Sequence, residues 1–167
     1  MKLNATSLLS LSTIAIATLF FASSCKKDNN NGSSGGFSAS INGTVFTPAQ
    51  TAGLYYQAYG ALEVVGYKIA GTDSSAIYVQ FDDTISLNKP VNISAFTGNA
   101  NSEVVWTDKS TDYDSFNDGS HGTMTVTSFD KTNKKVSGTF SGVLYASSGT
   151  DSVKVTNGNF TSTYVIF

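Results

Sequence analysis

Residues 135–146, KVSGTFSGVLYA, alternate between two kinds of side chain with a period of two. One side carries small or apolar residues, namely Val136, Gly138, Phe140, Gly142 and Leu144. The other side carries mostly polar residues, namely Ser137, Thr139, Ser141, Val143 and Tyr145. Because successive side chains of a strand point to opposite faces of its sheet, this pattern predicts a β-strand with one buried face. The two glycines on that face suit a close approach of another layer or a sharp bend.

The segments on both sides of this stretch alternate in the same way. GTMTVTSF (122–129) comes before it, and the linking DKTNKK contains the turn formers Asp130 and Asn133. SSGTD (147–151) then leads into SVKVTNGNFTSTYVIF (152–167). The pattern therefore predicts three consecutive antiparallel strands.

The rest of the mature region also has strand signals, and helical periodicity is missing at useful length. FSASINGTVFTPA (37–49) places Asn42 and Gly43 between apolar alternations, which is typical of a type I′ hairpin or a bulge. Four or five more strands are expected in GLYYQAYGALEVVGYKIAG, SSAIYVQFDD, KPVNISAFTG and SEVVWTD. The predicted fold is all-β, an antiparallel β-sandwich or closed β-barrel of about eight to nine strands.

Length and composition limit the classes of function. The chain has 167 residues, 40% of them hydrophobic, and its net charge is −2. We expect one domain, residues 37–167, large enough to fold without a disulfide or a metal. The ten basic residues are all lysines, so the bidentate contacts of arginine with nucleic acid are missing and no nucleic-acid partner is expected. A single cysteine excludes an internal disulfide and any multi-thiolate metal site.

Residues 1–24 have the layout of a signal peptide. Lys2 precedes an apolar run at 8–21, and small residues follow it. This run is shorter than the roughly 20 residues that a spanning helix needs, so a transmembrane anchor is the poorer interpretation.

Cys25 follows the small residues directly, and ASSC (22–25) resembles the lipobox of bacterial lipoproteins. This resemblance implies acylation of Cys25 and firm attachment to a membrane of a Gram-negative cell envelope, where we favour the outer membrane over the inner one. Residues 25–36 would form a lipidated flexible tether, because KKDNNNGSSGG contains no apolar residue that could pack. The tether would reach about 17 to 20 Å.

Three segments, FSASINGTVFTPA, GTMTVTSFD with KKVSGTFSG, and VTNGNFTSTY, resemble a family of small bacterial lipoproteins of unknown function. The resemblance covers the mature domain except for its middle third. It implies an all-β lipoprotein, and it carries no catalytic residue over, because the similar motifs consist of strand and turn residues.

The acidic stretch DKSTDYDSFNDG (108–119) is a weak candidate for a calcium site through Asp112, Asp114 and Asp118. Its spacing fails the EF-hand pattern, because Phe116 occupies a ligand position and no glutamate follows at the twelfth position. A solvated hairpin loop is the favoured interpretation. No metal or other cofactor is predicted.

Catalytic pairs are weakly supported. Ser120 and His121 are adjacent, but no nucleophile elbow surrounds them. Glu63 and Glu103 are the only glutamates, and Glu63 is expected to be solvated because it lies opposite the apolar Leu62 and Val64. The two glutamates therefore give little reason to expect a glycoside hydrolase.

Aromatic residues are the better binding candidates, with Trp106, Tyr55 and Tyr59 as first choices, since aromatic faces stack on sugars or apolar ligands. Packing within the sheet is the competing explanation. The many serines and threonines at outward positions, as in TMTVTS and NFTSTY, are expected to be only solvated.

The sequence thus favours a membrane-anchored envelope lipoprotein with a noncatalytic β-domain that binds a small ligand, a glycan or an envelope protein. Two alternatives stay open: an enzyme that acts on envelope glycans, and an assembly subunit that pairs through an edge strand.

Overall fold

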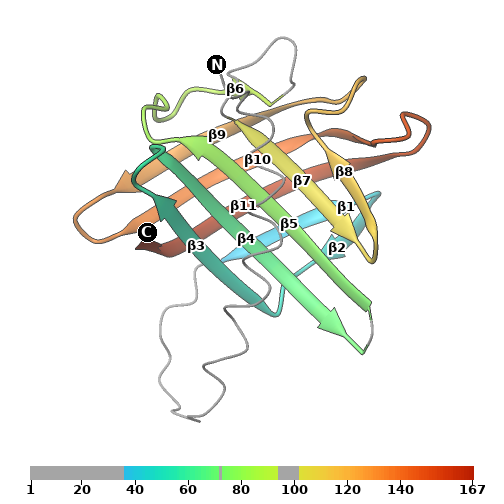
Figure 1. The fold of residues 1–167 in the computed structure, drawn as a ribbon, viewed down its shortest axis with the longest axis horizontal. Helices are drawn as coiled ribbons and strands as arrows, with labels where there is room; N and C mark the ends of the chain where they lie inside the picture. The colour runs from blue at the N-terminus through green and yellow to red at the C-terminus, as the bar shows by residue number, and fades with distance from the viewer. Residues whose placement is uncertain (1–35, 72, 94–101) are drawn as a thin grey trace, which may run out of the picture. The chain divides into compact units, whose positions relative to one another are not determined.

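The computed structural model describes residues 36–71, 73–93 and 102–167. Every regular element in these ranges is a β-strand, and the strands join in one sheet (Figure 1). They are β1 (Phe37–Ile41), β2 (Thr44–Phe46), β3 (Gln50–Tyr56), β4 (Ala61–Ala70), β5 (Asp73–Asp82), β6 (Val91–Asn92), β7 (Glu103–Asp108), β8 (Thr111–Asp114), β9 (His121–Asp130), β10 (Lys135–Ala146) and β11 (Ser152–Ile166). Within the described ranges, no helix has the length and apolarity needed to cross a membrane.

The three strands predicted around KVSGTFSGVLYA are confirmed. β10 covers the whole quoted stretch, and it pairs antiparallel with β9 on one side and β11 on the other. In the register, Gly138 lies between Val126 of β9 and Phe160 of β11. The alternation along β10 therefore predicted correctly which of its residues face the core.

The predicted turn at Asn42 and Gly43 is a two-residue hairpin between β1 and β2. Ile41 pairs with Thr44 across it. Both turn residues have positive φ, 49° for Asn42 and 82° for Gly43. Type I′ turns need this conformation at both positions, which explains the Asn-Gly sequence.

The sheet has eleven strands in the described ranges, so the expected eight to nine was too few. Their order is β2-β1-β11-β3-β4-β5-β7-β8-β10-β9-β6, and β11 also pairs with β10. The series from β11 through β3, β4, β5, β7, β8 and β10 consequently returns to β11. One strand that the prediction missed is β8, which lies inside the stretch that was interpreted as a solvated loop.

One pairing is parallel, which the antiparallel prediction did not anticipate. β3 runs parallel to the end of β11, with Gly53 opposite Tyr164. A long stretch of chain separates the two strands, so no short hairpin forces them to be antiparallel. A Cβ atom on Gly53 would lie 2.6 Å from the Thr163 carbonyl oxygen, so only glycine fits this close junction.

The hydrophobic core lies on one face of the sheet, here called the inner face. Its residues alternate along the strands, as Leu62 and Val64 do on β4, Ile77 and Val79 on β5, and Val136 and Phe140 on β10. The opposite, outer face carries the intervening side chains. Phe37, Phe81, Phe140 and Phe160 supply much of the core volume and contact one another with centroid distances of 5.8 to 6.4 Å.

We expect Gly138→Ala to lower the free energy of unfolding by about 1 to 3 kcal/mol, because inserting a methyl group into a packed core strains its neighbours. The new Cβ would lie 2.5 Å from the Phe160 ring and 2.6 Å from the Thr125 carbonyl oxygen. Gly36→Ala is the matched control, since nothing lies within 4 Å of its Cβ position. Urea unfolding measures both, and equal stabilities of the two variants would contradict this packing role.

Candidate functional site

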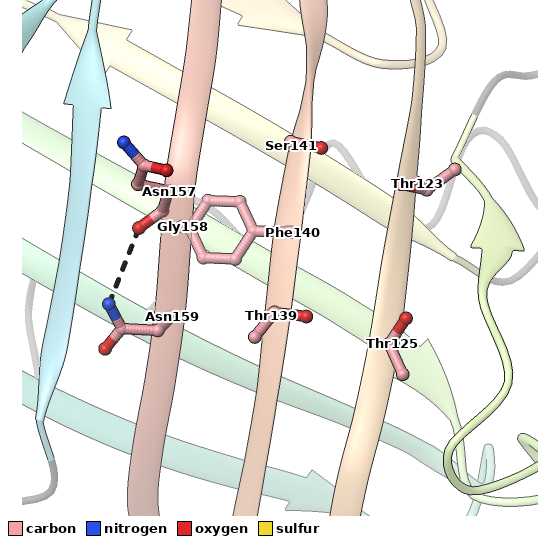
Figure 2. A pocket seen from close by; sticks show the side chains of 8 residues that line it. All are labelled: Thr123, Thr125, Thr139, Phe140, Ser141, Asn157, Gly158 and Asn159. Carbon is pink, nitrogen blue, oxygen red and sulfur yellow. Dashed lines mark hydrogen bonds between the residues drawn. The ribbon is translucent and has the colours of Figure 1, made fainter.

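A polar depression of about 410 Å³ lies on the outer face of β9, β10 and β11 (Figure 2). Hydroxyl and amide side chains dominate its lining, and no lining residue is charged. The lining residues are Thr123, Thr125, Thr139, Phe140, Ser141, Asn157, Gly158 and Asn159.

The register of the three strands brings these residues into rows across the sheet. Thr125 lies opposite Thr139, and Thr139 lies opposite Asn159. Thr123 lies opposite Ser141 in the next row. All five occupy the outward positions that alternate with core residues, so the same pattern that fills the core also builds this polar surface.

A β-bulge in β11 interrupts the regular surface beside these rows. The register between β10 and β11 shifts between Phe140 and Gly142. Asn157 lies in the bulge with a φ of 53°, a left-handed conformation that asparagine tolerates better than most residues. Bulges bend a strand and redirect its side chains, which fits the hollow at this position.

Most side-chain polar atoms of the depression have no hydrogen-bond partner among the described residues. Asn159 is engaged, because its Nδ2 donates to the Ser38 hydroxyl at 2.8 Å. It also donates, more weakly, to the Asn157 carbonyl oxygen at 3.5 Å, the contact drawn in Figure 2. Among the described residues, none forms a hydrogen bond with the side chains of Thr123, Thr125 or Thr139. These groups can both donate and accept hydrogen bonds from a ligand.

A second group of polar residues lies on the outer face of β4, β5, β7 and β8. Glu63 is opposite Gln80, and Gln80 is opposite Glu103, so the two glutamates flank β5. Asp114 of β8 forms a side-chain hydrogen bond with Glu103. The expectation that Glu63 is solvated was wrong, because only 5% of it is exposed and Val65, on the same face, is also buried.

Burial raises the pKa values of these carboxyl groups. Desolvation raises the pKa of Glu63 to about 7. Desolvation, with the negative charges of Asp114 and Glu63, raises the pKa of Glu103 to about 8. Desolvation also raises the pKa of Asp114, against the opposing hydrogen bond from the Phe116 amide. Near neutral pH the group therefore holds protons that ordinary carboxylates would have lost.

The three aspartates proposed for calcium do not form a cluster. Asp112 accepts a hydrogen bond from Thr107 at 2.7 Å, and Asp114 accepts one from the Phe116 amide at 2.7 Å. Asp118 is exposed in the loop after β8. In the described part of the chain, no three acidic, histidine or cysteine side chains are placed to hold a metal ion together.

The three aromatic candidates lie in different environments. Trp106 is 7% exposed and packs edge-on against Phe46 at a centroid distance of 5.0 Å, so its ring contributes to the core. Tyr59 is 73% exposed in the turn after β3. The structure does not bring these two rings and Tyr55 together on one binding surface.

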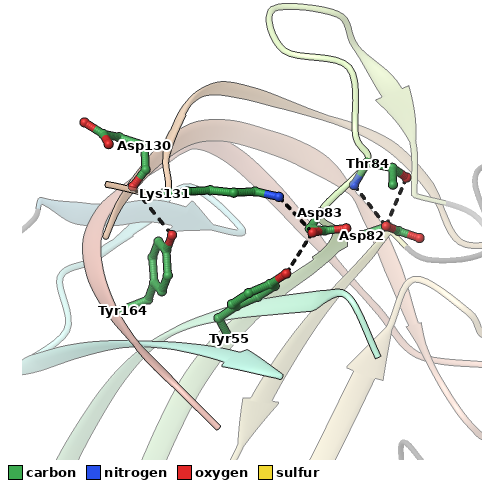
Figure 3. Close-up of polar contacts among 7 residues, drawn as sticks. All are labelled: Tyr55, Asp82, Asp83, Thr84, Asp130, Lys131 and Tyr164. Carbon is green, nitrogen blue, oxygen red and sulfur yellow. Dashed lines mark hydrogen bonds and ion pairs between the residues drawn. The ribbon is translucent and has the colours of Figure 1, made fainter. Parts of the chain in front are cut away.

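Tyr55 instead belongs to a polar and aromatic contact at the ends of several strands (Figure 3). Its hydroxyl donates to Asp83 Oδ2 at 2.7 Å, and Lys131 Nζ donates to the same oxygen at 2.9 Å. The hydrogen bonds to Lys131 and Tyr55 lower the pKa of Asp83. The Tyr55 ring also contacts Phe129 and Tyr164, edge-on, at 6.2 and 5.8 Å. These contacts join β3, β9 and β11.

Ser120 and His121 have separate structural contacts. The Ser120 hydroxyl donates to the Asp114 carbonyl oxygen and accepts from the Tyr145 amide, both at 2.8 Å. His121 Nδ1 lies 3.0 Å from the Gly119 carbonyl oxygen. The serine hydroxyl thus braces a turn, and the adjacent imidazole is not its base.

Cys25 and the tether residues 26–35 lie outside the described residues, so lipidation stays a prediction. Comparisons with known proteins found no matching family model, no similar curated protein and no similar solved structure. The resemblance to small lipoproteins of unknown function also stays a prediction.

The sequence showed the outward serines and threonines but not the depression. Alternation identifies which side chains face outward, whereas the hollow depends on the register of three strands and on a bulge. The only local signal was the Asn157-Gly158 pair inside an otherwise alternating strand.

The raised pKa of Glu63 predicts that the free energy of unfolding falls as pH rises from about 4.5, its ordinary pKa, through about 7. In this window the folded state keeps a proton that the unfolded chain releases, so the stabilisation is complete below the ordinary pKa and is lost above the raised one. Glu63→Gln should remove the contribution of Glu63 to this dependence, while that of Glu103 stays, and raise stability at pH 8 by about 3 kcal/mol.

Urea unfolding at pH 5 and pH 8 measures the effect. Asp73→Asn removes a negative charge at an exposed position and serves as the control. If Glu63→Gln and the wild type lose stability equally between these pH values, Glu63 is not the buried acid responsible.

Proposed function

We propose that this chain is an envelope lipoprotein, anchored through acylated Cys25, whose noncatalytic β-domain binds a neutral glycan in the depression between β9 and β11. The observation that carries the proposal is the lining: hydroxyl and amide groups without a charged side chain. Sugars present dense arrays of hydroxyl groups, and neutral side chains that both donate and accept are suited to pair with them.

The absence of charged side chains in this lining also favours a binding role over a catalytic one. General acid or base catalysis needs a group that exchanges protons near neutral pH, and threonine, serine and asparagine side chains do not. A charged ligand would gain no ion pair from the lining residues. A neutral glycan fits both restrictions.

For the fold we propose a closed β-barrel rather than a β-sandwich. Support comes from the series of pairings that starts at β11, passes through β3 to β10 and returns to β11. Closure leaves few free edges, which also makes the assembly alternative less favoured, because strand addition needs an open edge. In the described part of the chain the outermost strands, β2 and β6, have three and two residues, and β6 pairs with β9 only at Thr123 and Met124, so the end of β9 stays an open edge.

The membrane anchor predicts a defined result for Cys25→Ser. In a Gram-negative host, the full chain should incorporate labelled palmitate and fractionate with the outer membrane, and the variant should do neither, because serine provides no sulfur for the thioether. Mass spectrometry of the mature N-terminus is the decisive measurement. An unmodified Cys25 in membrane-extracted protein would contradict the anchor without affecting the glycan proposal.

Removing two hydroxyl groups from the depression should weaken glycan binding. Thr125→Val with Thr139→Val keeps size and strand propensity, and each lost hydrogen bond costs about 1 kcal/mol, so the double variant should bind about tenfold or more weakly. Affinity electrophoresis with dextran, laminarin and mannan tests neutral glycans, and alginate provides an anionic comparison.

The matched control is Thr127→Val with Thr163→Val, which removes two exposed hydroxyls from β9 and β11 outside the depression. Equal retention of the two double variants, or retention by alginate alone, would contradict the proposed site. Release of reducing ends during the assay would instead favour the alternative of a glycan-acting enzyme, for which the raised pKa values of Glu63 and Glu103 are the supporting observation.

A further inference from the structure

Glu63 has a buried polar atom without a partner. Its Oε1 is inaccessible to solvent, and in the described part of the chain it forms no hydrogen bond. Leaving a buried acceptor unpaired costs about 1 to 3 kcal/mol, and a charged one costs more. Proteins rarely keep such a group unless it serves a purpose beyond packing, which makes Glu63 the most informative unexplained residue of the outer face.

The groups that face Glu63 come from four neighbouring strands. Tyr56 of β3 and Tyr78 of β5 lie diagonally across from it, and its charge raises the pKa of both, after the larger effect of burial. Glu103 of β7 lies two strands away in register and is also influenced by the charge of Glu63. Asp114 of β8 completes the acidic group through its hydrogen bond with Glu103.

No described lysine contributes to the pKa shifts of Glu63, Glu103 or Asp114. Among the described residues, bound protons and not lysines therefore reduce the negative charge of this group near neutral pH. A ligand that brings a positive charge can replace those protons. In the described ranges, no three such side chains are placed to hold a metal ion together.

The surroundings of Glu63 add apolar walls. Leu54 lies opposite Glu63 on β3, and Val65 follows it on the same face of β4. Both are buried, at 7% and 3% exposure, yet neither belongs to the hydrophobic core cluster of the inner face. Glu63 thus combines an unpaired acceptor, two tyrosine rings and aliphatic neighbours on one side of the sheet.

We propose that Glu63, with its neighbours on the outer face of β4, binds an organic cation that has a primary ammonium group and a short apolar chain. The ammonium group would donate to Glu63 Oε1, with a second carboxyl of the Glu103 and Asp114 pair nearby. Tyrosine rings attract ammonium groups through their negative faces, and Tyr56 and Tyr78 lie diagonally across from Glu63 in the register. Leu54 and Val65 would contact the alkyl chain. This site is separate from the proposed glycan depression.

Because Glu63 Oε1 is inaccessible to solvent, the ligand must displace the side chains that cover it, and the neighbouring Tyr56, Tyr78 and Glu103 are only partly buried. Binding must also compete with protons. Glu63 has to ionise before it pairs with a cation, and with a pKa of about 7 only about a tenth of it is ionised at pH 6. The apparent Kd should therefore decrease about tenfold from pH 6 to pH 8.5, while an alkylammonium ion keeps its charge over this range.

Isothermal titration calorimetry of the full chain in detergent tests this with n-butylammonium chloride, and 1-pentanol is the neutral ligand of similar size. We expect butylammonium to bind about tenfold tighter at pH 8.5 than at pH 6 and to release protons into the buffer. Glu63→Gln should weaken binding at pH 8.5 at least tenfold and remove the pH dependence. Asp73→Asn, which neutralises an exposed carboxylate, should change neither.

Equal affinities for butylammonium and pentanol would overturn the proposal, because the site would then recognise only the apolar chain. Binding that does not depend on pH, or that Glu63→Gln leaves unchanged, would overturn it as well. If Glu63→Gln does not fold, Tyr78→Leu replaces it, and this variant should weaken butylammonium binding more than pentanol binding. Retention of neutral glycans by these variants, measured in parallel, keeps the outcome independent of the glycan proposal.

Discussion

The structure depends on β11, because both edges of this strand pair with other strands. One of its edges pairs with β10 over most of its length, and its other edge pairs first with β1 and then with β3. The junction with β3 requires Gly53, where any side chain would meet the backbone of Thr163. A single strand thereby joins the early and late parts of the sequence, and its bulge at Asn157 also creates the polar depression.

Local alternation predicted the strands whose one face is buried and whose other face is polar. β10 matches the prediction residue for residue, and the Asn42-Gly43 hairpin follows from turn chemistry. The parallel pairing of β3 with β11 could not be predicted, because alternation does not reveal which strand is the partner. The prediction for Glu63 was wrong because alternation does not reveal what covers the second face of a strand either. It assumed that Glu63 faces water because Leu62 and Val64 point to the core, but β4 is buried on both faces.

The two outer surfaces have contrasting chemistry. The β9 to β11 depression offers uncharged hydroxyls and amides at the surface, whose pairing does not depend on pH. The group around Glu63 on β4, β5, β7 and β8 places acids in a dry environment, so its charge changes near neutrality. One sheet can carry both because the inner face alone supplies the core, which leaves the outer face free to vary from strand to strand.

β11 is the last strand along the chain, and this position affects the rate of folding. Lys154 of β11 donates its amide to Asn42 Oδ1 across 112 positions of the chain, and β1 can reach its register only when β11 is present. Contacts of such high sequence separation slow folding, because the entropy of closing the long loop is lost before the contact forms. While the chain is being synthesised, the edges of β1 and β3 that pair with β11 stay unpaired until the last strand is made.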